Sequence, residues 1–321
     1  MTARIVILLV LCGLVAFSWA GACVVYRAAE MGEQVAPVPR RDFNALTIVT
    51  VGTGGGYENP ERAGPCTALG LGERIVLVDA GRGVSEALRS SHIPVSQPEW
   101  LLLTNLMPEN TVGLDDLLFT GWLTHRETPL RVIGPSGTRA YVDALLGAYA
   151  AATAARSSSL GLAPEGARID ARDVAAGWSG ELGGIEVRSG ELRGGPLPAL
   201  AWRFEHAGRS VVVSGTGWDP DGLASLASGA DALVHEAVFV PSREDAEAMG
   251  ITEDPERLER EGALHTSITD VGGLASRAGV HRLLLVRLRP PPAYAFQISG
   301  IVGGSFDGDI EVPDDGDEFE P

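Results

Sequence analysis

The stretch that decides the fold is Leu101-Leu102-Leu103-Thr104-Asn105-Leu106-Met107-Pro108-Glu109-Asn110-Thr111-Val112-Gly113-Leu114. Its three consecutive leucines, Leu101 to Leu103, are typical of a buried strand. The polar residues that follow predict a loop, and apolar residues at helical spacing predict a helix over Val112 to Leu123. The stretch therefore predicts a strand that delivers a polar loop to the start of a helix.

This arrangement resembles the signature of the metallo-β-lactamase superfamily, in its ribonuclease Z and arylsulfatase-like branch. In that family the strand ends in Thr-His-x-His-x-Asp-His, and x-x-Gly-Leu opens the helix. The frame is kept here, but the four metal-ligand positions carry other residues: Asn105, Met107, Glu109 and Asn110. The resemblance implies an α/β (α+β) fold, the αββα sandwich of that superfamily, over Leu46 to Phe319.

Further segments along the chain are similar to the family's other motifs. They are the glycine-rich turn Gly52 to Gly56 after a β-rich run, Val78-Asp79-Ala80-Gly81, Gly134-Pro135-Ser136-Gly137-Thr138, Ser214-Gly215-Thr216, His235-Glu236-Ala237 and His265-Thr266-Ser267. Two β-rich halves, each followed by helices, suit such a sandwich.

The resemblance also implies a role for single positions. The aspartate that bridges both metals is replaced by Thr216, the family's middle histidine falls near Gly194, and the last metal ligand is kept as His265. His235 matches a histidine that acts as proton donor together with the first-loop acid, here Glu109. We therefore take His235 and Glu109 as catalytic candidates and His265 as the metal-ligand candidate.

The substituted residues are poor ligands for zinc, which binds imidazole, carboxylate or thiolate. Asn105 and Asn110 offer neutral amides, and the Met107 thioether suits Cu(I). A plain structural role is the alternative for each position: Asn105 and Asn110 as loop residues that bond backbone groups, His265 as a capping or core histidine. Arg287 stands where the family has Thr-His.

These substitutions favour a catalytically degenerate hydrolase homologue that binds a ligand or partner and holds no metal cofactor. The alternative is a hydrolase of an ester or phosphodiester with one zinc ion at Glu109, His235 and His265. A third possibility is a structural partner of an active paralogue, in a heterodimer; a homodimer is equally compatible.

Composition sets further limits on function. The 321 residues carry a net charge of −17, and every basic residue other than histidine is arginine. An acidic surface repels phosphate backbones, so nucleic acid is not an expected partner. Of the three cysteines, Cys12 and Cys23 lie in or beside an apolar N-terminal segment, and Cys66 lies apart from them, so no disulfide framework is predicted.

The N-terminus predicts a membrane-directed chain. Ile5 to Tyr26 spans 22 residues, is mostly apolar and follows Arg4, a pattern of a signal peptide or an anchor helix. Ala20-Gly21-Ala22 fits a cleavage site, and cleaved and uncleaved forms both remain open. We expect a signal or anchor over 1–27, a linker over 28–42, the domain over 43–306, an acidic C-terminal tail over 307–321, and a membrane-anchored or exported, extracytoplasmic protein.

Overall fold

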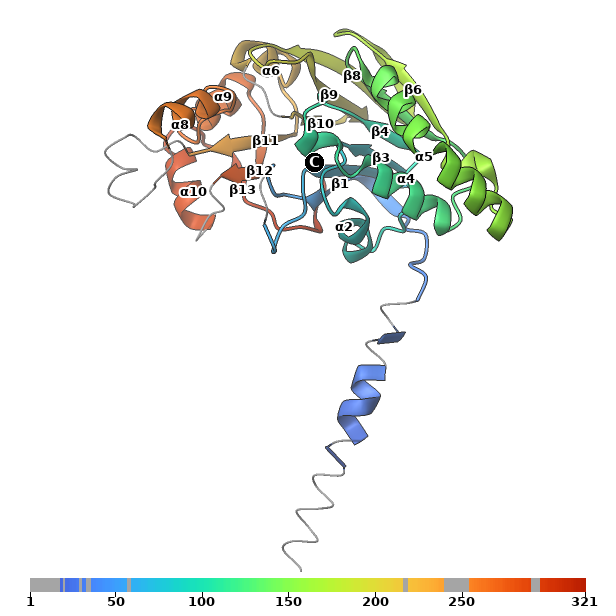
Figure 1. Cartoon of the computed structure of the whole chain (residues 1–321). Coiled ribbons are helices and arrows are strands. Elements are labelled where there is room, and N and C mark those ends of the chain that lie inside the picture. The colour runs from blue at the N-terminus through green and yellow to red at the C-terminus, as the bar shows by residue number, and fades with distance from the viewer. Residues whose placement is uncertain are drawn as a thin grey trace, which may run out of the picture. The chain divides into compact units, whose positions relative to one another are not determined.

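The computed structural model describes residues 18–19, 21–28, 31–32, 36–56, 59–215, 219–239, 254–289 and 295–321 (Figure 1). The chain divides into two compact units, Met1–Pro39 and Arg40–Pro321. In the first unit, residues 21–28 are helical, whereas 5–17 of the predicted signal or anchor lie outside the described residues. Among the helices that are described, none combines the length and the apolar character needed to cross a bilayer.

Sheet A holds seven strands in the order β14-β1-β2-β3-β4-β5-β6. The first three sequential strands pair antiparallel, and β3 through β6 run parallel. The strands are β1 (Phe43–Gly52), β2 (Cys66–Gly72), β3 (Arg74–Val78), β4 (Trp100–Leu102), β5 (Leu130–Gly134), β6 (Ile169–Asp173) and β14 (Asp317–Phe319).

Sheet B also holds seven strands, in the order β13-β12-β11-β10-β9-β8-β7. Here β7 through β10 pair antiparallel, and β10 through β13 run parallel. The strands are β7 (Ser179–Leu182), β8 (Ile185–Leu192), β9 (Ala199–His206), β10 (Arg209–Val213), β11 (Ala232–Val238), β12 (Arg282–Arg289) and β13 (Asp309–Glu311).

Three apolar clusters join four layers into one sandwich. The central cluster joins side chains of both sheets, including Ile48, Leu69, Trp202 and Phe204. The second packs helices on sheet A: α2 (Val84–Ser90), α4 (Leu114–Leu123) and α5 (Thr138–Leu160). The third packs α6 (Pro220–Leu226), α9 (Val271–Ala278) and α10 (Ala295–Val302) on sheet B, near α8 (Pro255–Gly262) (Figure 1). The predicted αββα sandwich is confirmed.

The helix expected over Val112 to Leu123 is α4, which begins two residues later at Leu114, and a short helix, α3 (Pro108–Thr111), lies in the stretch expected as a loop. The break between the two helices lies at Gly113, where a Cβ would come within 2.1 Å of the Gly81 carbonyl oxygen. The backbone N–H of Gly113 donates to the Ala80 carbonyl, and the N–H of Ala80 donates to the Asn110 carbonyl. The loop after β4 is thus held against the end of β3, which a continuous helix would not allow.

The acidic segment 307–321, expected as a tail outside the domain, contributes one edge strand to each sheet. β13 pairs with β12, and β14 pairs with β1. The Asp315 carboxylate accepts hydrogen bonds from the Thr53 N–H at 2.8 Å, the Thr53 hydroxyl at 2.6 Å and the Ala63 N–H at 2.5 Å. The folded domain therefore continues to Phe319, and its C-terminal segment fixes the turn after β1.

Candidate functional site

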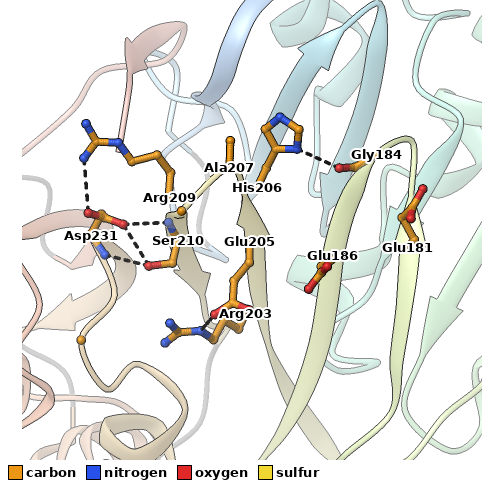
Figure 2. A pocket seen from close by; sticks show the side chains of 12 residues that line it. Glu181, Gly184, Glu186, Arg203, Glu205, His206, Ala207, Arg209, Ser210 and Asp231 are labelled. Atoms are coloured by element: carbon orange, nitrogen blue, oxygen red, sulfur yellow. Dashed lines mark hydrogen bonds and ion pairs between the residues drawn. The ribbon is translucent and has the colours of Figure 1, made fainter.

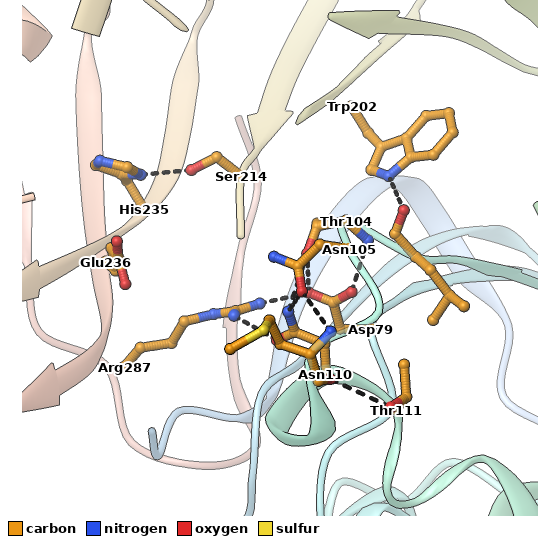
Figure 3. A network of polar contacts seen from close by, with 12 residues as sticks. Asp79, Thr104, Asn105, Asn110, Thr111, Trp202, Ser214, His235, Glu236 and Arg287 are labelled. Atoms are coloured by element: carbon orange, nitrogen blue, oxygen red, sulfur yellow. Dashed lines mark hydrogen bonds and ion pairs between the residues drawn. The ribbon is translucent and has the colours of Figure 1, made fainter. Parts of the chain in front are cut away.

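The candidate site lies where the carboxyl ends of the parallel strands of both sheets meet, which we call the rim. In α/β folds, this end of a sheet is where ligands bind. Asp79 follows β3, Thr104 lies just beyond β4, and Ser214 follows β10. Arg287 lies near the end of β12. Figure 3 shows the side chains of Asp79, Thr104 and Arg287 turned toward one another, whereas Ser214 faces His235.

Asp79 is the buried centre of the rim. Its two carboxylate oxygens accept hydrogen bonds from the Thr104 N–H and the Thr104 hydroxyl, both at 2.8 Å. Its backbone has φ 61°, which is uncommon for a residue other than glycine. Burial raises the pKa of the Asp79 carboxyl, whereas the Arg287 guanidinium and the Thr104 bonds act to lower that pKa.

Arg287 crosses from sheet B to sheet A. Its Nη2 donates to Asp79 Oδ2, and its Nη1 donates to Asn110 Oδ1 at 2.6 Å (Figure 3). The backbone N–H of Arg287 donates to the Thr53 carbonyl at 2.7 Å, and its φ is 56°. The side chain is only 7% exposed, so a buried cation lies among the loops where the family's metal ligands are expected.

The two asparagines of the first loop bond to each other. Asn110 Nδ2 donates to Asn105 Oδ1 at 2.6 Å, and the same oxygen accepts the Met107 N–H at 2.9 Å. Both amides are buried. Both side-chain oxygens thus already accept hydrogen bonds: the Asn110 oxygen accepts from Arg287, and the Asn105 oxygen accepts from Asn110.

The other predicted ligand positions are spread over different surroundings. Met107 and Glu109 are half-buried, and Glu109 lies against the glycine-rich turn, since a Cβ at Gly56 would be 3.2 Å from the Glu109 Cβ. Gly194 is exposed with φ 101°, in the connection between β8 and β9. Thr216 lies outside the described residues.

His235, taken as a catalytic candidate, is fully buried on β11. Its Nδ1 contacts the Ser214 hydroxyl, and its Nε2 lies 2.8 Å from the Thr266 hydroxyl. Burial lowers the pKa of His235 to about 4, so the ring is neutral at pH 7. A neutral imidazole with both nitrogens bonded inside the protein does not suit the predicted role of proton donor. Sequence reasoning missed both hydroxyl partners.

We expect the buried His235 to make stability depend on pH. Its pKa falls from 6.5 to about 4 on folding, so the unfolded state binds more protons between these values. The free energy of unfolding should therefore be unaffected by this histidine above pH 6.5 and should decrease as the pH falls toward 4. The total decrease due to His235 is about 3 kcal/mol. Urea titrations of the natural protein and of His235→Gln should show a smaller acid loss in the variant. Equal losses in the two proteins would contradict a buried neutral ring.

His265, taken as the metal-ligand candidate, pairs with a buried carboxylate. Its Nδ1 lies 2.8 Å from Glu236 Oε2, and the Thr266 N–H donates to Glu236 Oε1 at 3.3 Å. Glu236 is almost fully buried, whereas the His265 side chain is 19% exposed. A partly exposed imidazole oriented by a carboxylate can transfer a proton to a bound molecule.

The donor groups assembled at the rim do not fit a dinuclear zinc site. Such a site needs several imidazoles and carboxylates directed at each metal. Around Arg287 the structure brings together two amides and one carboxylate that already pairs with a guanidinium. Across the described ranges, no group of three or more His, Cys, Asp or Glu side chains converges on one point.

A concavity lies away from the rim, at the amino ends of β10 and β11 (Figure 2). It has a volume of about 530 Å³ and a charged lining. Arg203 pairs with Glu205 at 2.7 Å, and Asp231 accepts hydrogen bonds from the Ser210 N–H and hydroxyl. Several of its charges are therefore paired within the cavity itself, and none of the predicted site residues lies there.

A close contact at Gly215 gives a test of how tightly the two sheets meet at the rim. A Cβ at Gly215 would lie 2.0 Å from Thr104 Oγ1, so Gly215→Ala should displace the Asp79 partner and cost about 1–3 kcal/mol. Gly147→Ala is the matched control, since nothing lies within 4 Å of its Cβ and it sits in helix α5. The control should be neutral or gain up to about 1 kcal/mol. Thermal unfolding of both variants measures the difference, and equal shifts would contradict the contact.

Comparison with known proteins gives close relatives, although no protein-family model matches the chain. Ribonuclease Z of Mycobacterium bovis is 31% identical over 277 residues, which cover 84% of this chain and 96% of the relative. Ribonuclease Z of Mycobacterium sp. (strain KMS) is 32% identical over 276 residues, covering 84% and 94%.

Solved structures show the same fold at lower identity. The metallo-beta-lactamase fold protein YhfI from Bacillus subtilis superposes with TM-score 0.64 at 18% identity, covering 86% of this chain and 99% of its own. The short form of human tRNase Z has TM-score 0.62 at 18% identity, with the same coverage.

These relatives correct the predicted location of the protein. They are ribonucleases that match the present chain over nearly their whole length. The prediction of a membrane-anchored or exported, extracytoplasmic domain, drawn from Ile5 to Tyr26 alone, is wrong on this comparison.

Proposed function

This chain belongs to the ribonuclease Z family of the metallo-β-lactamase superfamily, and from that premise we propose that it is a non-hydrolytic member whose rim binds a ligand or a partner without metal. In this proposal the chain has the fold of the family and a site at the same position, but the chemistry of that site differs. Hydrolysis in a dinuclear site depends on a metal-activated hydroxide, and the donor groups at this rim are not those that would hold such metals.

One observation carries the proposal: the bond between Asn110 Nδ2 and Asn105 Oδ1 at 2.6 Å, in the loop where the family places imidazoles. An amide oxygen is a weak zinc ligand. Both amide oxygens are also occupied as hydrogen-bond acceptors within the protein. The Asn105 oxygen accepts from Asn110 Nδ2 and from the Met107 N–H, and the Asn110 oxygen accepts from Arg287 Nη1. Coordination of a metal would require these hydrogen bonds to break.

The charge of the chain indicates which ligands suit the rim. A net charge of −17 disfavours a polyanion such as RNA, because the field of the whole protein repels it. Glu109 and His265 are the partly exposed titratable groups among the predicted site residues. We therefore expect a neutral or cationic ligand that hydrogen-bonds to these side chains.

A second candidate function is a metal-dependent hydrolase with a reduced zinc site. It is favoured by the 31–32% identity to ribonucleases Z and by the His265–Glu236 pair, which could position an imidazole for a metal. Of the three ligands expected for such a site, His235 has both ring nitrogens bonded to hydroxyls. This leaves Glu109 and His265, fewer than the three protein ligands that catalytic zinc normally has.

The two functions are separated by metal content and activity measured on one preparation. We expect the chain, purified and then dialysed against zinc, to hold much less than one zinc ion per molecule by elemental analysis. It should also leave a precursor tRNA and a simple phosphodiester uncleaved. A mycobacterial ribonuclease Z, treated identically, is the positive control. Stoichiometric zinc together with cleavage would establish the second candidate instead.

A further inference from the structure

We infer that Arg287 is a built-in cation that neutralises and cross-links the rim in place of a bound metal, and that the space its guanidinium fills is a cation-binding site. This inference goes beyond the proposed function, because it assigns a charge and a ligand class to a defined position.

The first support is the set of groups that one guanidinium joins. It bonds to Asp79 after β3 and to Asn110 in α3, both on the side of sheet A, although Arg287 belongs to sheet B. The Arg287 backbone adds a bond to Thr53 after β1. A guanidinium has a planar fork of donors that suits several oxygen acceptors at once. A metal ion at such a rim would likewise be surrounded by oxygen and nitrogen atoms from several loops.

The second support is burial. Asp79 is 0% and Arg287 7% exposed, and a buried charge is costly unless it is paired and hydrogen-bonded. An apolar pair of similar size would often be as stable as a buried ion pair. Both residues also adopt positive φ, a strain that persists only where the surroundings impose it. The rim thus keeps a cation and a carboxylate at a position where packing alone would not require them.

The third support is the composition of the wall around the guanidinium. Asp79 Oδ2 and Asn110 Oδ1 both accept hydrogen bonds from the guanidinium. Asn105 Oδ1 is linked to the same network, because it accepts a hydrogen bond from Asn110 Nδ2. Shortening Arg287 would leave a cavity edged by one carboxylate and amide oxygens. Oxygen acceptors around a negative charge attract a cation of matching size, and free guanidinium has the same shape as the lost group.

The test is chemical rescue of Arg287→Ala. The variant should have a lower Tm than the natural protein. Guanidinium chloride, at concentrations far below those that denature, should raise its Tm in a saturable manner. Urea, the neutral analogue of nearly the same shape, and sodium chloride should not. The natural protein should show no rise with any of the three, because its own guanidinium fills the site.

A matched control is Arg126→Ala. Arg126 is also buried, and within the part of the chain that the structure describes its guanidinium donates to two backbone carbonyls, of Val95 at 2.7 Å and Leu117 at 3.2 Å, and to no carboxylate. No described carboxylate bonds to the Arg126 guanidinium, so added guanidinium should rescue Arg126→Ala much less than Arg287→Ala. The double variant Arg287→Ala with Asp79→Asn should lose the rescue. Equal rescue by urea and guanidinium, or no rescue of Arg287→Ala, would overturn the inference.

If Arg287→Ala does not accumulate as folded protein, Arg287→Lys and Arg287→Met decide the question. Both side chains are long and flexible, and only lysine carries a charge. The lysine variant should have the higher Tm of the two. A methionine variant at least as stable as the lysine variant would mean that packing, not charge, is what Arg287 supplies. Zinc content does not enter this comparison, so its result is independent of the proposed function.

Discussion

Asp79→Asn should lower the free energy of unfolding by about 3–5 kcal/mol, because it leaves the Arg287 guanidinium buried without its carboxylate. The variant keeps the shape of the side chain and removes its charge. Thr104 would also lose a charged acceptor for its N–H and its hydroxyl. Urea denaturation monitored by circular dichroism gives the difference directly.

An exposed ion pair is the control for this prediction. Arg40 and Glu73 form an ion pair at 3.1 Å, but their side chains are 54% and 59% exposed. Glu73→Gln should therefore cost less than about 1 kcal/mol. Asp79→Asn combined with Arg287→Met should cost less than the sum of the two single changes, since both members of the ion pair are then removed together. A loss for Asp79→Asn no larger than that for Glu73→Gln would contradict the central role of the pair.

Deletion of residues 313–321 should abolish or severely reduce the folded protein. The segment contains β14, which pairs Phe319 with Ile48 of β1, and removing it exposes that edge of sheet A. It also contains Asp315, whose hydrogen bonds to Thr53 and Ala63 involve a charged acceptor and contribute about 3 kcal/mol or more together. Soluble yield and Tm of the shortened chain are the measurements.

The deletion removes both a strand and several acidic charges, so a variant that removes charge without removing a strand is the control. Asp307 is exposed and precedes β13, so Asp307→Asn removes one acidic charge of the same region without touching a strand. Its Tm should equal that of the natural protein. A shortened chain with an unchanged Tm would mean that the segment is the free acidic tail that composition suggested.

Local pattern predicted most of the frame. The apolar run Leu101 to Leu103 predicted a strand, which is β4 at Trp100–Leu102. The apolar residues at helical spacing over Val112 to Leu123 predicted the helix that is α4 at Leu114–Leu123. Such runs carry their own period and their own turn residues, so each can be recognised without knowledge of the rest. β13 and β14 were not predicted, because strands of three residues rich in acidic side chains show no β pattern. Their positions are set by pairing with strands far away in the sequence.

The chemistry of the rim depends on contacts of the same long-range kind. Arg287 and Asp79 are 208 positions apart, and Arg287 and Asn110 are 177 apart. The sequence held a signal for this pair: a single arginine after the apolar run Leu283 to Val286, and a single aspartate after Ile75 to Val78. Charged residues at the ends of two buried strands are candidates for a buried ion pair, but only the fold shows that these ends meet.

The two histidines illustrate the same limit. His235 and His265 both matched family motifs, and nothing in their neighbours along the chain distinguished their states. The structure places His235 between two hydroxyls in the core and His265 beside the Glu236 carboxylate near the surface. Burial and partner, rather than residue type, decide which imidazole can exchange a proton with a ligand.

The most direct test of the central claim, that a protein cation stands where the family's metals are expected, is a crystal structure of the natural chain grown with excess zinc and recorded at the zinc absorption edge. We predict guanidinium density between Asp79 and Asn110 and no anomalous peak at the rim. An anomalous peak bonded to Glu109, His265 or Asp79, with the Arg287 side chain displaced from Asp79, would contradict the account.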